Sequence, residues 1–235
     1  MSLRSGGVSR APWDSLNLGL GVGDEAAAVA QNRARFAAAL GARPVWLQLE
    51  HGARVMRLTA ESVDCPPTPA DAAWTTARGV ACTVTIADCM PALFALRDGR
   101  AVAAAHAGWR GLAAGVLEAT LQALCRGTGA KPADVQAWLG PCIGPQRFEV
   151  GADVLAAFGV RADQGGCFGF EPRPRADGSP RWLADLAGLA QKRLATAGIG
   201  AISLARACTA QDESRFFSFR RSGVTGRMAA AIWRC

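Results

Sequence analysis

Residues 80–111 read VACTVTIADCMPALFALRDGRAVAAAHAGWRG, and the pattern of this stretch indicates the architecture of the chain. Between positions 80 and 87, bulky apolar side chains alternate with small or hydroxyl-bearing ones, which is the two-residue period of a β-strand. Residues 92–96 and 101–105 form two more apolar runs on either side of Asp98-Gly99, a dipeptide typical of tight hairpin turns. The stretch therefore predicts three consecutive strands, of which the last two pair as an antiparallel hairpin.

Around this centre, helices and strands mix without a strict βαβ alternation. Asp24 and Gly41 have the residue types of a helix cap and a helix stop, and they flank the first predicted helix. Apolar periodicity predicts helices over 25–40, 112–124 and 183–194, strands over 45–49, 54–58, 135–139 and 199–205, and a terminal helix or strand over 224–233. We expect one compact α+β domain over residues 1–235, with mixed β-sheets flanked by helices.

The composition is that of a folded, non-membrane protein. Half of the 235 residues are hydrophobic and 19% are charged, which excludes wholesale disorder. Because 49 residues are alanine, the core must depend on larger aliphatic side chains, Phe and the seven Trp. The most apolar window, Gly79 to Leu96, contains Asp88 and Pro91, which excludes a membrane-spanning helix there.

The positive charge of the chain comes almost entirely from arginine. The formal net charge is +7, and Lys131 and Lys192 are the only lysines among 26 basic residues. The arginines are scattered rather than gathered in runs, so we expect no nucleic-acid partner. The richest stretch, Pro172 to Arg181, is predicted to be a Pro/Arg loop. Because arginine binds phosphate with a bidentate fork, the composition is compatible with a phosphate-bearing substrate.

The cysteines point to a reducing compartment. None of the eight lies in a C-x-x-C pair, so they show no metal-knuckle spacing. The first thirteen residues lack the apolar segment of a secretory signal. We therefore expect a cytoplasmic protein with free thiols, either a monomer or a dimer.

The hairpin brings one of these cysteines close to a histidine. With Asp98-Gly99 at the turn, Pro91 faces His106 across the two strands. Cys89 shares a face with Pro91, so Cys89 and His106 are diagonal neighbours about 7–8 Å apart. The only other histidine, His51, follows a predicted strand and is able to supply a third ligand. Two imidazoles and a thiolate form a zinc site whose fourth position stays open for water or substrate.

These residues lie in motifs that resemble those of the YfiH-type laccase-domain family. The motifs cover nearly the whole chain in order: Asn17-Leu18-Gly19, His51-Gly52-Ala53-Arg54-Val55, Ala87-Asp88-Cys89-Met90-Pro91, His106-Ala107-Gly108-Trp109-Arg110-Gly111, residues 140–145 (GPCIGP), residues 215–221 (RFFSFRR) and residues 225–228 (TGRM).

The resemblance implies an enzyme and its cofactor. Proteins of this family are regarded as zinc-dependent purine nucleoside phosphorylases with adenosine deaminase activity, acting on adenosine, inosine and methylthioadenosine, with a fold similar to that of toxin deamidases. Their metal ligands fall on His51, Cys89 and His106, which we expect to be the catalytic residues. Arg110, just before the helix predicted at residue 112, is expected to bind phosphate, and Asn17 to bind substrate or phosphate. Trp109 and the Phe216-Phe217 pair either stack on a purine or belong to the core.

The chain departs from the family pattern at two places, and other functions stay open. Leu49-Glu50 stands where relatives usually have Gln-Val before the first His-Gly, and Gly21 stands where a histidine is common. A metal-free cysteine hydrolase or deamidase using Cys89 and His106 is one alternative. A copper-binding polyphenol oxidase is another, although two histidines allow a single copper centre and no multicopper cluster. The non-enzymatic alternative is a basic nucleic-acid-binding module.

Overall fold

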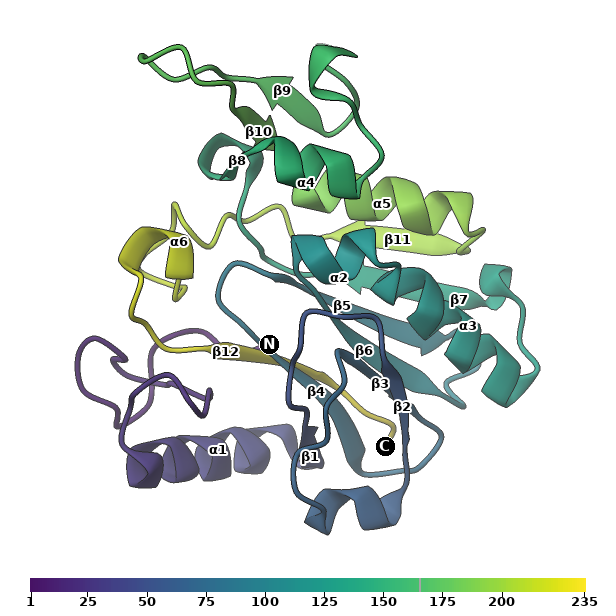
Figure 1. The fold of residues 1–235 in the computed structure, drawn as a ribbon. Coiled ribbons are helices and arrows are strands. Elements are labelled where there is room, and N and C mark those ends of the chain that lie inside the picture. Colours follow the sequence, from purple (N-terminus) through teal and green to yellow (C-terminus); the bar gives the residue numbers. More distant parts are fainter. Residues whose placement is uncertain (165) are drawn as a thin grey trace.

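The computed structural model describes residues 1–164 and 166–235, and a mixed six-stranded sheet forms the centre of the fold (Figure 1). The strand order is β11-β7-β5-β6-β3-β2; the outer pairs β2/β3 and β7/β11 are parallel and the inner pairs are antiparallel. The strands are β2 (Val55–Leu58), β3 (Ala72–Thr75), β5 (Met90–Leu96), β6 (Val102–Ala107), β7 (Val135–Leu139) and β11 (Ala201–Leu204). The predicted hairpin is confirmed, because Pro91 pairs with His106.

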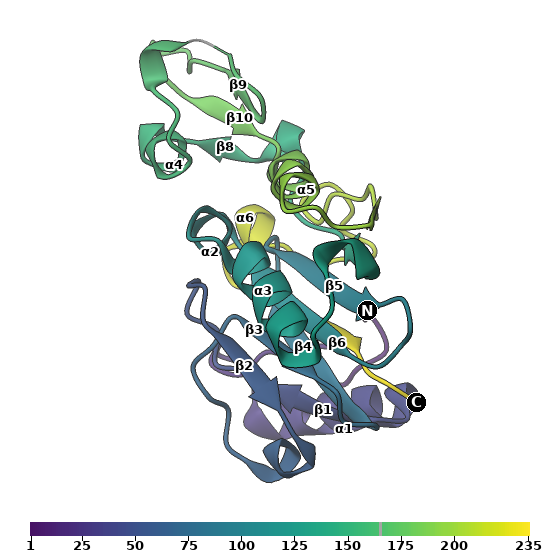
Figure 2. The ribbon, with the colours of Figure 1, turned by 90° about the vertical axis from the view of Figure 1, so that its right-hand side faces the viewer.

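The remaining strands form two smaller sheets. The first has the order β1-β4-β12, in which β1 runs parallel and β12 antiparallel to β4. The second has the order β8-β10-β9 and is antiparallel throughout. Their strands are β1 (Arg43–Trp46), β4 (Val80–Ile86) and β12 (Met228–Ile232), then β8 (Glu149–Val150), β9 (Phe170–Pro172) and β10 (Trp182–Ala184). The β8-β10-β9 sheet projects from the rest of the molecule (Figure 2).

Helices cover the outer faces of the two central sheets. The α-helices are α1 (Ala26–Leu40), α2 (Trp109–Ala113), α3 (Val116–Thr128), α4 (Ala152–Ala157), α5 (Leu186–Thr196) and α6 (Phe219–Ser222); the 3₁₀ helices are η1 (Ala60–Asp64), η2 (Pro132–Asp134), η3 (Pro145–Arg147) and η4 (Ala162–Gln164). Helix α3 packs on the six-stranded sheet and α1 packs beside β1 (Figures 1 and 2). This is the expected α+β architecture with mixed sheets flanked by helices.

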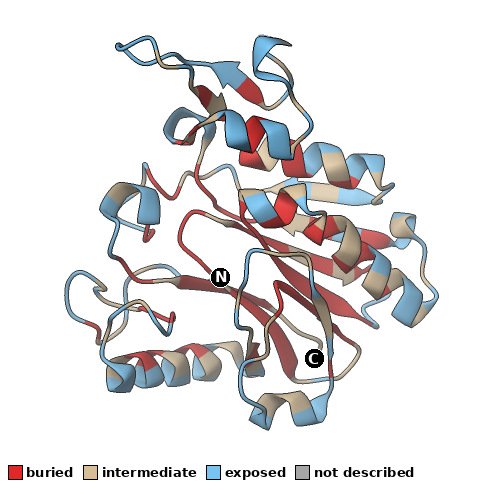
Figure 3. Cartoon of the chain, viewed as in Figure 1, coloured by how far each residue is buried: buried red, intermediate tan, exposed pale blue. Residues whose placement is uncertain are grey.

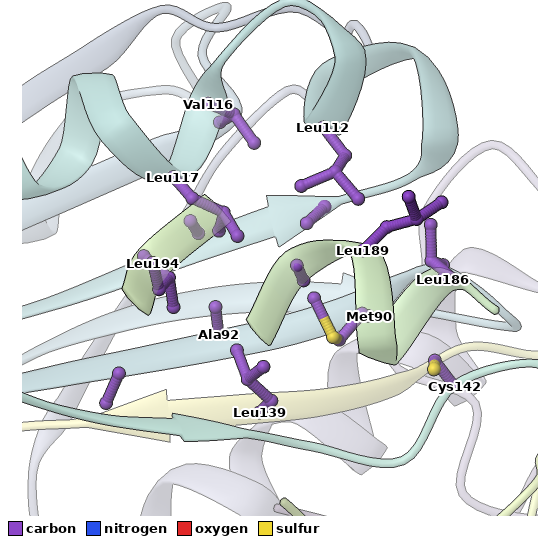
Figure 4. Close-up of a cluster of buried hydrophobic side chains, with 14 of the residues drawn as sticks. Met90, Ala92, Leu112, Val116, Leu117, Leu139, Cys142, Leu186, Leu189 and Leu194 are labelled. Carbon is purple, nitrogen blue, oxygen red and sulfur yellow. The ribbon is translucent and has the colours of Figure 1, made fainter. Parts of the chain in front are cut away.

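The buried residues gather between these layers (Figure 3). The largest cluster lies between α2, α3, α5 and the six-stranded sheet, where Leu112, Leu117 and Leu194 meet Met90 and Leu139 (Figure 4). A second cluster lies between the six-stranded sheet and β4. Along β6, alternate alanines join the first cluster, while Val102 and Ala104 join the second. Alternation therefore turns His106 toward the space between the two sheets.

Several predicted boundaries are wrong for local reasons. The helix expected over 112–124 is two helices, because Gly115 adopts a left-handed conformation (φ 89°) between α2 and α3. The helix expected from residue 183 starts at Leu186, since the Asp185 side chain caps it by accepting a hydrogen bond from Gly188 N. Residue 183 itself lies in β10, a strand that sequence patterning did not predict.

The prediction that Asp24 caps the first helix is also wrong. Glu25 occupies the N-cap position without a side-chain cap, and the Asp24 carboxylate instead accepts hydrogen bonds from Ser9 Oγ (2.6 Å) and Asn17 Nδ2 (2.8 Å). The C-terminal stop at Gly41 is confirmed, with φ 65° and its N–H bonded to Ala37 O. The ambiguous segment 224–233 contains strand β12.

No helix among residues 1–164 and 166–235 has both the length and the apolar character needed to span a bilayer.

A single glycine sets how closely α3 approaches the sheet. Gly127 lies inside α3, where glycine is less favourable than alanine by about 1 kcal/mol. A Cβ atom added at Gly127 would overlap the indole ring of Trp74, which lies on β3 and is 6% exposed. The glycine is therefore required by packing against Trp74.

We expect Gly127→Ala to destabilise the protein by about 1–2 kcal/mol, because overpacking outweighs the gain in helix propensity. Denaturant unfolding of Gly127→Ala, Trp74→Leu and the double variant measures the coupling between the two positions. Leu at position 74 removes the overlap, so Gly127→Ala should be neutral or stabilising in that background. An alanine that stabilises the wild-type background would contradict this account.

Candidate metal centre

A cavity of about 860 Å³ contains all three predicted metal ligands. His51, Cys89 and His106 line it, and their ligand atoms all lie within 4.8 Å of one another. The Cys89 Sγ is 3.9 Å from His51 Nε2, and the two imidazole rings meet edge to face with their centroids 4.8 Å apart. Within the described residues, this is the one group of three or more His, Cys, Asp or Glu side chains so arranged.

Cys89 stands in the bend that joins β4 to β5. The preceding residue, Asp88, has φ 95°, a strained value for a residue other than glycine. Its carboxylate accepts hydrogen bonds from Thr209 Oγ1 (2.6 Å) and from the backbone N–H of Arg220 (2.7 Å). The buried Asp88 carboxylate thus anchors the bend that presents the thiol.

His106 lies near the end of β6, and its ring is fixed by a carboxylate. Its side chain is 3% exposed, and Nδ1 is 2.9 Å from Asp71 Oδ1. Asp71 is 1% exposed and directly precedes β3, the neighbour of β6 in the sheet. This contact directs Nε2 of His106 to the metal position, since the other ring nitrogen is occupied.

The same carboxylate shapes the loop that carries His51. Asp71 accepts backbone hydrogen bonds from Glu50 (3.2 Å), His51 (2.9 Å) and Gly52 (2.7 Å). His51 has φ 60°, a left-handed value that costs free energy in a residue other than glycine. Among the residues that the structure describes, His51 and Asp88 are the two non-glycine residues with positive φ. Both strained positions lie at the metal trio.

Two glycines of the His106–Gly111 motif keep space open for the trio. A Cβ at Gly108 would stand 2.8 Å from Cys89 Sγ and 3.2 Å from His51 Cδ2. A Cβ at Gly111, in α2, would stand 2.9 Å from the carbonyl oxygen of Gly52. The first glycine lets the thiol and the imidazole meet, and the second lets α2 approach the His51 loop.

The electrostatics of the trio favour a thiolate next to a charged imidazole when no metal is bound. Burial opposes ionisation of Cys89, but the charges and hydrogen bonds of His106 and His51 outweigh it and lower the pKa of the thiol. Burial likewise opposes protonation of His106, but the Cys89 thiolate and Asp71 raise its pKa above the ordinary value. For Asp71, burial is outweighed by the hydrogen bonds from His106 and from the loop N–H groups, which lower its pKa. The site therefore presents a deprotonated sulfur.

Arginines and aromatic rings form much of the remaining lining. Arg33 stacks on Trp46 with 3.9 Å between its Cζ and the ring centroid, and burial lowers its pKa to about 10, so it stays charged at neutral pH. Arg110 lies over Trp109 at 4.2 Å, and Arg227 lies 5.9 Å over Phe219. The lining arginines are Arg33, Arg110, Arg220 and Arg227.

The other predicted site residues are divided between the buried interior and the wall of the cavity. Asn17 is fully buried, and its side chain bonds Gly19, Asp24 and the backbone N–H of Arg227; its direct contact with substrate stays a prediction. Phe216 and Phe217 are 2% and 0% exposed and belong to the core, whereas Trp109 lines the cavity. Asp71 was not predicted, and the only signal is an acidic residue next to a short apolar run.

Comparison with known proteins places this geometry in a family. The whole chain, residues 1–235, matches the family model described as "Multi-copper polyphenol oxidoreductase laccase". The chain is 47% identical over 233 residues to "Purine nucleoside phosphorylase PA4543" of Pseudomonas aeruginosa, covering 99% of this chain and 91% of the relative. It is 45% identical over 235 residues to "Purine nucleoside phosphorylase YfiH" of Escherichia coli, with the same coverage.

A solved structure shows the same fold. The crystal structure of the Neisseria meningitidis protein NMB0706 superposes with a TM-score of 0.87 at 41% identity, covering 99% of this chain and 91% of that one. Full-length identity, the family match and the shared fold agree, and the chain belongs to the laccase-domain family of YfiH-type proteins.

Proposed function

We propose that the protein is a zinc-dependent purine nucleoside phosphorylase that also deaminates adenosine. The observation that carries the proposal is the convergence of His51, Cys89 and His106 in a cavity whose lining also includes four arginines and four aromatic rings. The names of the relatives in Pseudomonas aeruginosa and Escherichia coli support it. The proposed substrates are adenosine, inosine and methylthioadenosine, together with inorganic phosphate.

The donor set fits zinc. Two imidazole nitrogens and one thiolate are ligands that zinc prefers, and three protein ligands leave a coordination position open. The lowered pKa of Cys89 supplies the deprotonated sulfur that a metal requires. A bound zinc ion would act as a Lewis acid at the open position. Copper accepts the same donors, so the identity of the metal is part of the test.

The arginines give phosphate a place to bind. Arg110 lies in the first turn of α2, four residues after His106. It lines the cavity, and its guanidinium lies over the ring of Trp109. Its planar fork matches two phosphate oxygens. The half-buried Arg227 lines the same cavity, where the charges of Cys89 and Asp88 partly offset the lowering of its pKa by burial. We assign phosphate binding to Arg110, with Arg227 supporting the same anion.

Two aromatic rings are available to the purine. Phe219 is 58% exposed although it lines the cavity, and Trp109 lines the same cavity. An exposed ring on a backbone held by the Ser218 cap and the Arg220–Asp88 hydrogen bond is a firm platform for a planar base. Phe219 therefore replaces the buried Phe216-Phe217 pair as the second stacking candidate.

These residues support the following reaction. A phosphate oxygen forms a bond to the anomeric carbon while the bond from that carbon to the purine nitrogen breaks, and the base leaves with a proton. Positive charge develops on the sugar, as in glycoside cleavage, and the phosphate held by arginine offsets it. The products are the free base and the sugar 1-phosphate, which is ribose 1-phosphate for adenosine and inosine and methylthioribose 1-phosphate for methylthioadenosine. In deamination, water adds to the purine carbon that carries the amino group, and ammonia leaves.

The second histidine favours a metal site over a metal-free cysteine hydrolase. A Cys–His pair requires one imidazole beside the sulfur, and here both His51 and His106 interact with Cys89. Three donors within 4.8 Å of one another fit a shared ion, whereas a Cys–His pair gives the second imidazole no assigned role. One trio also gives no more than a single copper centre, which argues against multicopper oxidation.

The decisive experiment combines metal analysis with an activity assay. Purified protein should contain close to one zinc per chain and release hypoxanthine from inosine only when phosphate is present. Cys89→Ala should lose most of the metal and the activity, whereas Cys65→Ala, at an exposed cysteine that does not line the cavity, should retain both. Stoichiometric copper with oxidase activity, or hydrolysis by metal-free protein, would instead support one of the alternatives.

Asp71→Asn tests the carboxylate that positions the trio. The amide keeps the shape of the side chain but loses its charge and one acceptor, so His106 and the His51 loop are held less firmly. We expect zinc affinity to fall by about 10- to 100-fold while the protein stays folded. Competition with a zinc chelator measures the affinity, and thermal unfolding of the metal-free proteins serves as the control. Equal affinities in the two proteins would refute the positioning role.

Arg110→Lys separates phosphate binding from the rest of the site. Lysine keeps the positive charge but not the planar guanidinium that binds two phosphate oxygens at once. The KM for phosphate should therefore rise, or turnover should fall, by about tenfold or more. Adenosine deamination uses water in place of phosphate and should change less. Both activities are measured on protein with verified zinc content. An equal loss of the two would show that Arg110 maintains the architecture of the cavity instead.

A further inference from the structure

A second cavity, of about 630 Å³, lies beside the metal cavity and carries an excess of arginine. We call it the arginine pocket, after Arg147, Arg173, Arg175, Arg181 and Arg220, all of which line it. Among the described residues that line it, Glu149 is the one acid. The pocket is built on the β8-β10-β9 sheet and includes Arg173, Arg175 and Arg181 of the Pro/Arg segment 172–181.

The hairpin that follows β9 places like charges on one face. Trp182 pairs with Pro172, and the next pair brings Arg173 opposite Arg181, whose carbonyl oxygen accepts a hydrogen bond from Arg173 N (2.7 Å). Arg175 lies two residues further along and therefore on the same face as Arg173. Like charges directly opposite each other destabilise a strand pair. The hairpin keeps this arrangement at a cost to its own stability.

The carboxylates nearby neutralise only part of the charge. Glu149 Oε1 accepts hydrogen bonds from Arg175 Nε (2.9 Å) and Nη2 (2.5 Å), and Arg181 Nε lies 3.9 Å from the same oxygen. Glu171 pairs with Leu183, whose side chain lines the pocket, and Asp177 is in the hairpin loop. Five arginines thus line the pocket with one carboxylate, and they outnumber Glu149, Glu171 and Asp177 together, so the folded protein retains positive charge at this site.

We propose that the arginine pocket binds a small polyphosphate, meaning two or three linked phosphates, free or on a nucleotide. Guanidinium groups bind phosphate oxygens in pairs, and here they come from three segments of the chain: the hairpin between β9 and β10, η3 and α6. A chain of phosphates offers oxygens to more of these five guanidinium groups than a single phosphate does. The pocket is a small, open hollow, and its local shape fits a compact anion rather than the long surface that a nucleic acid strand follows.

Arg220 connects this pocket to the metal cavity. It lines both cavities, and its guanidinium donates hydrogen bonds to the carbonyl oxygens of Glu149 (2.9 Å) and Arg147 (3.5 Å). Its backbone N–H binds the carboxylate of Asp88, the residue before Cys89. Arg220 is thus the one described residue that the linings of the two cavities share.

Inorganic tripolyphosphate is the probe for the test, and calorimetric titration measures its binding. The wild-type protein should bind about one tripolyphosphate per chain, with an affinity that falls as salt is added. The double variant Arg173→Ala/Arg181→Ala should weaken binding by about tenfold or more, because two guanidinium groups that can bind phosphate oxygens are removed. Arg10→Ala/Arg126→Ala is the matched control: it removes the same charge from two exposed positions elsewhere, and its affinity should stay within about twofold of wild type.

Further variants decide between binding sites and between ligands. Cys89→Ala should keep its affinity for tripolyphosphate, because the pocket lies outside the metal trio. Loss of affinity in Cys89→Ala but not in Arg173→Ala/Arg181→Ala would place the anion in the metal cavity and overturn the proposal. A fall of less than about threefold in Arg173→Ala/Arg181→Ala would overturn it too. Tighter binding of a single-stranded oligonucleotide than of tripolyphosphate, weakened by the same substitutions, would refute the choice of a small ligand.

Discussion

The metal trio depends on one buried carboxylate. Asp71 holds Nδ1 of His106 with one oxygen, and together its two oxygens accept three consecutive backbone N–H groups from the loop that carries His51. A carboxylate that is 1% exposed is stable as an anion only when such partners replace water. The same contacts therefore satisfy a buried charge, hold His51 in a left-handed conformation and select the ring nitrogen that His106 offers to a metal.

The mixed sheet explains why this one side chain reaches both ligands. Strand β3 pairs with β6, which brings Asp71 beside His106, and it pairs with β2, which follows the His51 loop. Cys89 arrives from the other neighbour of β6, strand β5. Three segments distant in sequence thus meet at one end of adjacent strands. Because no two members of the trio are close in sequence, the trio forms only with the folded sheet, and an ion held by it would stabilise the folded state.

The hairpin and its cysteine–histidine pair were predictable because they follow from local patterns. Alternation and the Asp98-Gly99 turn determine the register, which the structure confirms at Pro91 and His106. Asp71 was not predictable in this way. Its partners His51 and His106 lie 20 and 35 residues away in the sequence, and no periodic pattern indicates these contacts. Strands β8 and β10 have two and three residues, which is too short for a recognisable alternation of apolar and polar residues. The arginine pocket built on them was therefore not predicted from the sequence either. Local rules predict elements, whereas these contacts depend on the topology of the sheet.

The charge balance of the metal cavity points to an anionic substrate. Arg33, Arg110, Arg220 and Arg227 line the cavity together with the Asp88 carboxylate, whose oxygens are already bound by Thr209 and by the Arg220 N–H. A divalent metal bound by one thiolate and two neutral imidazoles would add a further net positive charge. The burial that lowers the pKa of Arg33 and Arg227 shows that part of this charge is held away from water, where it is most costly. A dianionic phosphate beside a neutral nucleoside compensates such a cavity, whereas a neutral phenol does not. The electrostatics thus favour phosphorolysis over phenol oxidation on the same scaffold.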